Sequence, residues 1–204
     1  MLQKIQRFGG AMLMPSILFA FFGLVVGLTS ILKNPNLVGS IATEGTLWYN
    51  FWFVVEQGGW TIFNQMPVVF ALGIPIGLAK KANGRAALEA FLIYMVYNYF
   101  INGFLTQFKF FGVDVTPALK LPTGITRIAG AITLDTSIIG SIVIASISVW
   151  IHNKYFDKKL PELLGIFQGS TFVILIGFIL MIPAAFLTAL LWPKVQLGIA
   201  ALQG

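Results

Sequence analysis

The sequence contains no cysteine, a single histidine and few charges: only 10% of its 204 residues are Asp, Glu, Lys or Arg. An average soluble domain carries about 25% charged residues, so this composition argues against a water-soluble fold. The missing cysteine excludes a disulfide framework, a cysteine-ligated metal and a cysteine nucleophile or phosphoryl acceptor within these residues. Among the charged residues the acidic ones are the fewer: seven Asp and Glu against thirteen Lys and Arg give a net charge of +6.

Long apolar runs are abundant instead, with 57% hydrophobic residues and a mean hydropathy of +0.87. A membrane-spanning helix needs about 20 mostly apolar residues. Five segments are long enough: 7–33, 47–79, 86–106, 132–150 and 163–192. The second contains two prolines and exceeds one straight span, which predicts a long or broken helix, and Pro183 predicts a kink in the fifth. The sequence therefore predicts an all-α integral membrane protein with about five transmembrane helices.

The segment 107–130 alternates apolar residues with Pro and Gly, which is compatible with short extended or re-entrant structure. Aromatic residues stand near the proposed span ends, as is typical of membrane–water interfaces. These are Trp48, Trp52, Trp60, Trp150, Tyr155 and Trp192.

The basic residues predict an orientation. Short segments on one side of the predicted spans hold eight of them: Lys4, Arg7, Lys80, Lys81, Arg85, Lys154, Lys158 and Lys159. Longer loops on the other side hold five: Lys33, Lys109, Lys120, Arg127 and Lys194. By the positive-inside rule the N-terminus is cytoplasmic and the fifth span ends outside, as half of a larger membrane protein would. Clustered basic residues between apolar runs favour anionic lipid headgroups over nucleic acid as partners.

Ionisable residues inside apolar segments are the first candidates for function, because burying them is costly. Glu56 has two interpretations: a carboxylate that lines a hydrophilic route, or an interfacial residue on an external loop that precedes a span beginning near Phe63. Asp135, in LDTS before the fourth span, suits helix capping, since its carboxylate can accept hydrogen bonds from the first free amides.

Two further ionisable residues have local explanations. Glu89 lies four residues after Arg85, so the two are expected to pair in the first turn of the third span. His152 follows the fourth span among lysines, and we expect a juxtamembrane residue in a solvated basic loop rather than a proton or phosphoryl acceptor. A metal would need more ligands than are found near His152.

No catalytic, substrate-binding or metal site and no cofactor is predicted from motifs. The segment has no phosphate-binding GxxxxGK[ST], no GxSxG and no HExxH. Three GxxxG pairs, Gly23/Gly27, Gly73/Gly77 and Gly165/Gly169, permit close helix packing. With 21 glycines, about two such pairs arise by chance, so this signal is weak.

Three stretches carry a resemblance: LQKIQRFGGAMLMPSILF, NQMPVVFALGIPIGLAKKANGRAALEAF and TGITRIAGAITLDTSIIGSIVIASISVWIHNKYFDKKLPELLGIFQGSTFV. Together they resemble the membrane-embedded IIC component (EIIC) of bacterial phosphoenolpyruvate-dependent sugar phosphotransferase systems (PTS), in the glucose, maltose and α-glucoside branch. The strings LDTSIIGS and HNKYFDKKLPELLGIFQGS are the most specific. The likeness extends from Leu2 to about Trp192.

The resemblance implies a permease of the bacterial cell membrane that binds sugar from outside and holds it while a IIB partner phosphorylates it. The phosphate comes through IIA and IIB carriers. It also implies a homodimer, with a scaffold and dimer-forming first half and a sugar-carrying second half. Residues 1–204 are then a partial EIIC domain, its N-terminal scaffold half, and the chain on its own has no assigned enzymatic step.

Some family features are not matched by this sequence. The sugar-contacting histidine and the GITEP-like loop belong to the family's second half. The string TGIT at 123–126 is followed by Arg127 and Ile128 instead of acidic residues, so no sugar-binding role is transferred to it. His152 lies outside the sugar-binding motif, and without cysteine no IIB domain of the usual type is fused within these residues.

Two alternatives stay open at this stage. One is a self-sufficient oligomeric channel or facilitator with polar residues such as Asn64, Gln65, Asn98 and Asn102 lining a pore. The other is a vestigial or regulatory membrane protein, from a truncated permease gene, that pairs with intact permeases. The sequence does not name the sugar.

Overall fold

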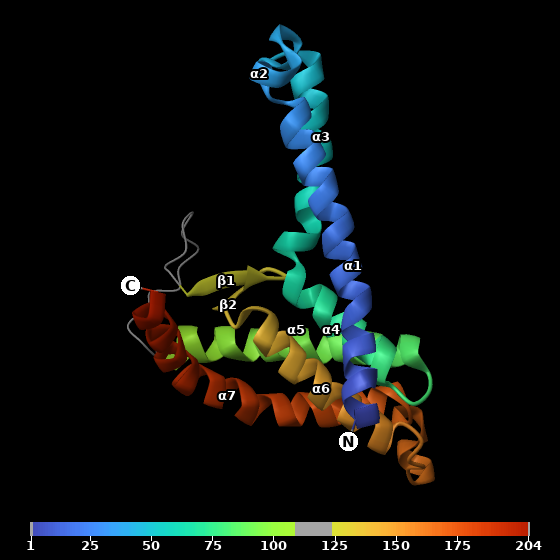
Figure 1. The fold of residues 1–204 in the computed structure, drawn as a ribbon. Helices are drawn as coiled ribbons and strands as arrows, with labels where there is room; N and C mark the ends of the chain where they lie inside the picture. The colour runs from blue at the N-terminus through green and yellow to red at the C-terminus, as the bar shows by residue number, and fades with distance from the viewer. Residues whose placement is uncertain (1, 109–123, 204) are drawn as a thin grey trace.

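A computed structural model describes residues 2–108 and 124–203 (Figure 1). Its elements in chain order are α1 (Leu2–Leu32), α2 (Pro35–Val38), η1 (Ser40–Ala42), α3 (Leu47–Asn64), α4 (Met66–Leu78), α5 (Asn83–Phe108), β1 (Ile125–Ile128), β2 (Ala131–Leu134), α6 (Ser137–Tyr155), η3 (Glu162–Phe167) and α7 (Ser170–Gln203). Helices dominate the described part of the chain, and one two-stranded hairpin accompanies them.

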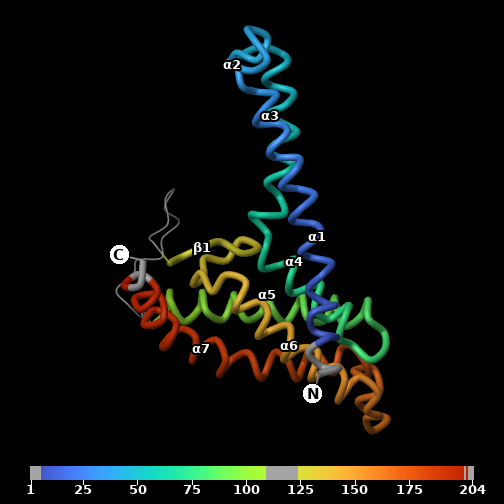
Figure 2. Tube along the Cα trace, viewed as in Figure 1, coloured from blue at the N-terminus to red at the C-terminus, as the bar shows by residue number. Residues whose placement is uncertain are grey.

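Residues 2–64 form a long arm in which α1 and α3 lie side by side, joined at the tip by α2 and η1 (Figures 1 and 2). Local caps fix the tip: Asn34 Oδ1 accepts from the backbone N–H of Asn36 at 3.0 Å, and Thr46 Oγ1 accepts from that of Tyr49 at 3.2 Å. Such caps satisfy amides that have no partner inside the helix.

The second predicted span is broken, as expected. Helices α3 and α4 meet at Gln65 and are bent by 60° relative to each other. Pro67 stands in the first turn of α4, where a backbone N–H would have no partner within the helix, so its absence costs nothing. The same proline prevents α3 from continuing straight into α4. Counted as one span, this pair brings the total to five, beside four single helices that are long and apolar enough to cross a membrane.

Helices α5, α6 and α7 pack together at the base of the arm and hold most of the core (Figure 1). Glycines allow the closest approaches. A Cβ on Gly177 of α7 would overlap the side chain of Ile93 on α5, and Cβ atoms on Gly73 and Gly77 of α4 would overlap Pro15 and Ala11 of α1. The pair Gly73/Gly77 is therefore a real close-packing motif, and it acts within the chain.

The other two GxxxG pairs make no such approach. A Cβ on Gly23 would meet only Phe63, at 3.8 Å, and one on Gly27 would meet nothing within 4 Å. Gly165 lies in η3, and Gly169 has a φ of +70°, a conformation that glycine adopts without strain.

The prediction that the fourth span starts at Ile132 is wrong, because a short strand precedes the helix there. Residues 131–134 form β2, which pairs antiparallel with β1 around a two-residue turn, and α6 starts only at Ser137. The turn residues Ala129 and Gly130 both have positive φ, at 47° and 87°, as tight hairpin turns require. The extended structure expected in 107–130 is thus found at its end, while residues 109–123 lie outside the described part.

The fifth span also differs at its ends. Residues 162–167 form the 3₁₀ turn η3, and α7 runs as one helix from Ser170 to Gln203 through both Pro183 and Pro193. The fold class is otherwise as predicted.

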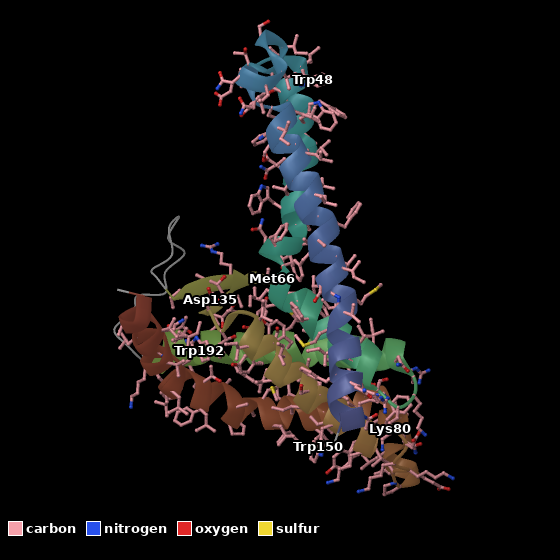
Figure 3. The ribbon with its side chains drawn as sticks, viewed as in Figure 1. Trp48, Met66, Lys80, Asp135, Trp150 and Trp192 are labelled. Carbon is pink, nitrogen blue, oxygen red and sulfur yellow. The ribbon has the colours of Figure 1, made fainter. Side chains whose placement is uncertain are left out.

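The grouping of basic residues is supported by contacts between two distant turns. The backbone N–H of Lys80, after α4, donates to Asn153 Oδ1 of α6 at 2.8 Å, and Lys81 forms an ion pair with Asp157. Figure 3 shows Lys80 and Trp150 at this same end of the molecule, where α1 also begins.

The α1–α4 contact generates a testable prediction. Gly77→Ala places a methyl group against the backbone of Ala11, so we expect overpacking to destabilise the protein by about 1–3 kcal/mol. The matched control is Gly27→Ala in α1, which meets no neighbour and should not lower stability. Unfolding of detergent-purified variants measures both, and equal stability of the two variants would contradict the close approach.

Candidate functional site

In the described part of the chain, the ionisable side chains of Glu89 and His152 are each only 1% exposed. Glu89 lies in the second turn of α5 and His152 in the last turn of α6. His152 Nδ1 is 2.6 Å from Glu89 Oε2, and His152 Nε2 is 2.9 Å from the carbonyl oxygen of Lys81. One imidazole ring therefore connects α6 to α5 and to the α4–α5 turn.

The hydrogen bonds determine how many protons this cluster holds. The carbonyl of Lys81 only accepts, so Nε2 of His152 carries a proton. The contact between Nδ1 and Glu89 needs a second proton, on either the ring or the carboxyl group. Either way the pair holds two protons and is neutral overall, which is the form that an apolar interior tolerates.

Two sequence predictions are corrected here. Glu89 does not pair with Arg85, and His152 is not a solvated loop residue. Helix α6 continues to Tyr155, beyond the predicted end at Trp150, and this extra turn directs His152 inward. Arg85 is exposed, and its guanidinium lies 6.0 Å from the centre of the Phe156 ring.

A second ion pair lies in the arm. Lys33, just after α1, forms an ion pair with Glu56 of α3, and the two side chains are 13% and 12% exposed. Ser30 Oγ donates to the same carboxylate at 3.1 Å, and the rings of Tyr49 and Phe53 lie 5.3 and 5.2 Å from the ammonium group. The loop interpretation of Glu56 is wrong, because the residue lies inside α3 and ties it to the end of α1.

The capping role predicted for Asp135 is confirmed. Its Oδ1 accepts from the backbone N–H of Ser137, the first residue of α6, at 2.9 Å, while Thr136 occupies the cap position. The carbonyl of Asp135 also accepts from Trp192 Nε1 at 2.8 Å and from Gln196 Nε2 at 3.2 Å. These bonds attach the start of α6 to α7.

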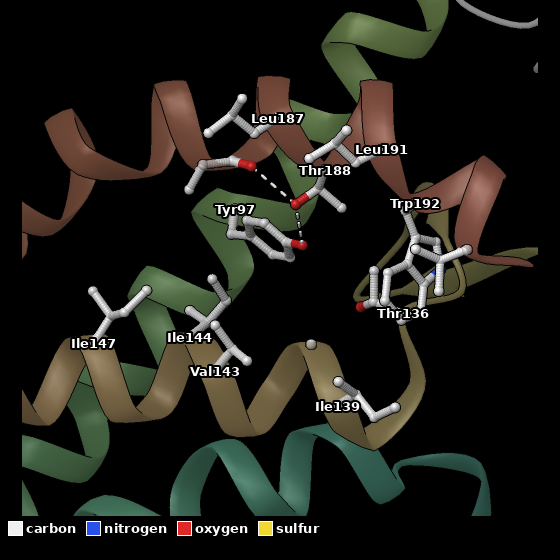
Figure 4. Close-up of a pocket in the computed structure, with 13 residues that line it drawn as sticks. Tyr97, Thr136, Ile139, Val143, Ile144, Ile147, Leu187, Thr188, Leu191 and Trp192 are labelled. Atoms are coloured by element: carbon white, nitrogen blue, oxygen red, sulfur yellow. Dashed lines mark hydrogen bonds between the residues drawn. The ribbon is translucent and has the colours of Figure 1, made fainter.

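A groove of about 310 Å³ lies between α5, α6 and α7 (Figure 4). Its walls are mainly aliphatic side chains, with Trp192 at one end. Tyr97 donates to Thr188 Oγ1 at 2.9 Å, and Thr188 donates in turn to the carbonyl of Ala184 at 2.9 Å. Tyr97 and Thr188 are bonded to each other, Thr136 adds one further hydroxyl that has no partner, and no carboxylate or imidazole lines the groove. The groove is therefore suited mainly to apolar groups and not to acid–base chemistry.

The four polar residues that the channel alternative places along a pore do not line a common channel in the described part of the chain: two bond to backbone carbonyls and two are exposed at a bend. Asn98 Nδ2 donates to the carbonyl of Tyr94 and Asn102 Nδ2 to that of Ile132, both at 2.8 Å. Asn64 and Gln65 are exposed at the bend between α3 and α4. Within residues 2–108 and 124–203, no three His, Asp or Glu side chains gather into a group that could hold a metal.

Long apolar helices and ionisable side chains that are paired in the interior define a multi-pass α-helical membrane protein. Comparison with known proteins gives the family. The profile described as phosphotransferase system, EIIC matches residues 9–204, so the chain belongs to the EIIC family of bacterial sugar phosphotransferase systems.

Relatives extend this assignment. The chain is 55% identical over its full length to the α-glucoside-specific EIICB component of a PTS in Leptotrichia buccalis and 54% identical to the maltose-specific EIICB component of Bacillus subtilis. It covers 38% and 39% of those two proteins. The glucose-specific EIICBA component of Staphylococcus carnosus is 32% identical over 97% of the chain, which covers 28% of that protein. The resemblance inferred from the sequence is confirmed.

The buried pair generates the second prediction. Glu89→Ala leaves His152 without its charge partner, and loss of one member of a buried pair costs about 3–5 kcal/mol of unfolding free energy. Replacing both, as in Glu89→Met with His152→Leu, should recover part of that loss, because no buried ionisable group is then left without its partner and only the carbonyl of Lys81 loses a donor. Unfolding of Glu89→Met, His152→Leu and the double variant in mixed micelles measures the cycle.

The exposed ion pair of Lys81 and Asp157 provides the control for this cycle. Asp157→Asn should change the unfolding free energy by less than about 1 kcal/mol. Strictly additive effects of the Glu89 and His152 substitutions would contradict the contact.

Proposed function

We propose that this chain is the membrane scaffold of a PTS permease that imports an α-glucoside, such as maltose, coupled to its phosphorylation. The observation that carries the proposal is the difference in identity: 55% and 54% to the α-glucoside- and maltose-specific relatives, against 32% to the glucose-specific one. We therefore prefer an α-glucoside to glucose as the substrate.

A division of labour follows from the length of the relatives. The chain spans about two-fifths of the α-glucoside- and maltose-specific proteins that it matches. We propose that residues 1–204 form the N-terminal scaffold part of an EIIC domain, and that sugar contacts and phosphoryl transfer belong to the remaining length and to IIB and IIA partners. The absence of cysteine from the chain and the apolar lining of the groove support this division.

The scaffold is proposed to be a homodimer with a cytoplasmic N-terminus. Support for the orientation comes from the two basic turns, which contact each other at the end where α1 begins. Support for the dimer comes from the arm, whose apolar side chains are exposed along α1 and α3, including Leu24, Leu28, Phe51 and Val54. Such a surface suits lipid or a second copy of the chain.

Uptake measurements test the proposed function. In vesicles that lack every other phosphotransferase protein, we expect the chain alone to accumulate no maltose. A chimera that joins residues 1–204 to the remaining length of the Bacillus subtilis relative should accumulate maltose phosphate when phosphoenolpyruvate and the carrier proteins are supplied. Sugar equilibration by the chain alone, without phosphoenolpyruvate, would refute the scaffold proposal and favour the channel alternative.

Single cysteines test the orientation, because the chain contains none of its own. Ser40→Cys at the tip of the arm should react with a membrane-impermeant maleimide in intact cells. Lys159→Cys in the basic turn after α6 should react only after the cells are permeabilised. Both positions are exposed, so the opposite labelling pattern would place the N-terminus outside.

A further inference from the structure

Six cations gather on one surface formed by the α4–α5 turn and the end of α6. This basic face consists of Lys80, Lys81, Arg85, Lys154, Lys158 and Lys159, all exposed. Two carboxylates lie in the same segments, Asp157 and Glu162, and the first pairs with Lys81. The face therefore keeps a clear excess of positive charge.

The face is built from segments that are locked together. The carbonyl of Lys81 accepts from buried His152, the N–H of Lys80 donates to Asn153, and Arg85 lies over the ring of Phe156. The backbone segments that carry these cations, about 70 residues apart in sequence, are thus held against each other. No loop has to be ordered to bring these cations to one anion, which lowers the entropic cost of binding.

Exposed apolar side chains follow these cations closely in sequence, and aromatic rings contact one of them. In η3, Leu163 is 92% exposed and Ile166 is 89% exposed. Lys154 Nζ lies 4.9 Å from the ring centre of Trp150 and 5.2 Å from that of Tyr155. Basic side chains next to Trp and Tyr are typical of the level at which lipid headgroups meet hydrocarbon.

The place of the face in the chain brings it to the bilayer surface. Its residues lie just before or at the start of α5 and at the end of α6 before α7, and all three helices are apolar and long enough to span. A partner here offers phosphate to the cations and hydrocarbon to Leu163 and Ile166. We propose that the basic face and η3 together bind an anionic phospholipid, with the cations on its phosphate and η3 inserted among the acyl chains.

An acidic protein surface would also attract the cations. It would not explain why Leu163 and Ile166, between α6 and α7, are almost fully exposed. The orientation proposed above decides only which leaflet supplies the lipid. Lipid binding in detergent involves no sugar and no phosphate carrier, so its failure would leave the permease proposal untouched.

Native mass spectrometry of the detergent-purified chain tests the proposal, with phosphatidylglycerol and phosphatidylcholine of identical acyl chains as probes. We expect the chain to retain phosphatidylglycerol in preference to phosphatidylcholine. Lys158→Gln with Lys159→Gln should weaken phosphatidylglycerol binding about thirtyfold at low salt, from about fivefold for each lysine near an anionic surface. Added salt should reduce the preference of the unmodified chain.

Lys194→Gln is the matched control, since this lysine is exposed near the far end of α7 and should leave binding unchanged. A second variant, Leu163→Ser with Ile166→Ser, should weaken the binding of both lipids. Equal retention of both lipids by the unmodified chain, or unchanged binding by the double lysine variant, would overturn the proposal. So would binding of an acidic phosphate-carrier domain without any lipid preference, which would assign the face to a protein partner.

Discussion

The arrangement of the helices depends on one buried contact, the imidazole of His152 between Glu89 and the carbonyl of Lys81. In an apolar interior neither side chain is stable alone, so each restricts where the other's helix can lie. The contact sets α6 against the start of α5 and holds the turn after α4 in place. The Lys80–Asn153 and Lys81–Asp157 contacts join the same two basic turns, so the three contacts together hold these turns at one end of the molecule.

In the arm, too, a pair of ionisable side chains with little exposure joins two helices. Lys33 and Glu56 pair near the tip and join α1 to α3, while Gly73 and Gly77 let α4 lie directly against α1 at the base. Helices in lipid gain little from burying apolar surface, because the surrounding chains are as apolar as leucine. Polar pairs and small residues therefore supply the specificity that a hydrophobic core supplies in water.

The sequence predicts those features that depend on neighbouring residues. Hydropathy locates the spans, Pro67 indicates the break in the second, and Asp135 beside Ser137 indicates a cap. Hydropathy places the apolar residues 131–134 in a span, because it does not distinguish a buried strand from a helix end. The partner of Glu89 is 63 residues away, so spacing along one helix favoured Arg85. The inward position of His152 depends on an extra turn of α6 that only packing reveals.

The buried ionisable pairs also bear on where sugar is selected. A site that discriminates a sugar needs several hydrogen-bonding groups free to meet its hydroxyls, because an unmatched buried polar group is what rejects the wrong ligand. Glu89 pairs with His152 and Lys33 with Glu56, and the groove between α5, α6 and α7 offers only the bonded pair of Tyr97 and Thr188 and the single free hydroxyl of Thr136. We therefore infer that these residues hold the permease together, and that selection among sugars belongs to the length of the relatives beyond this chain.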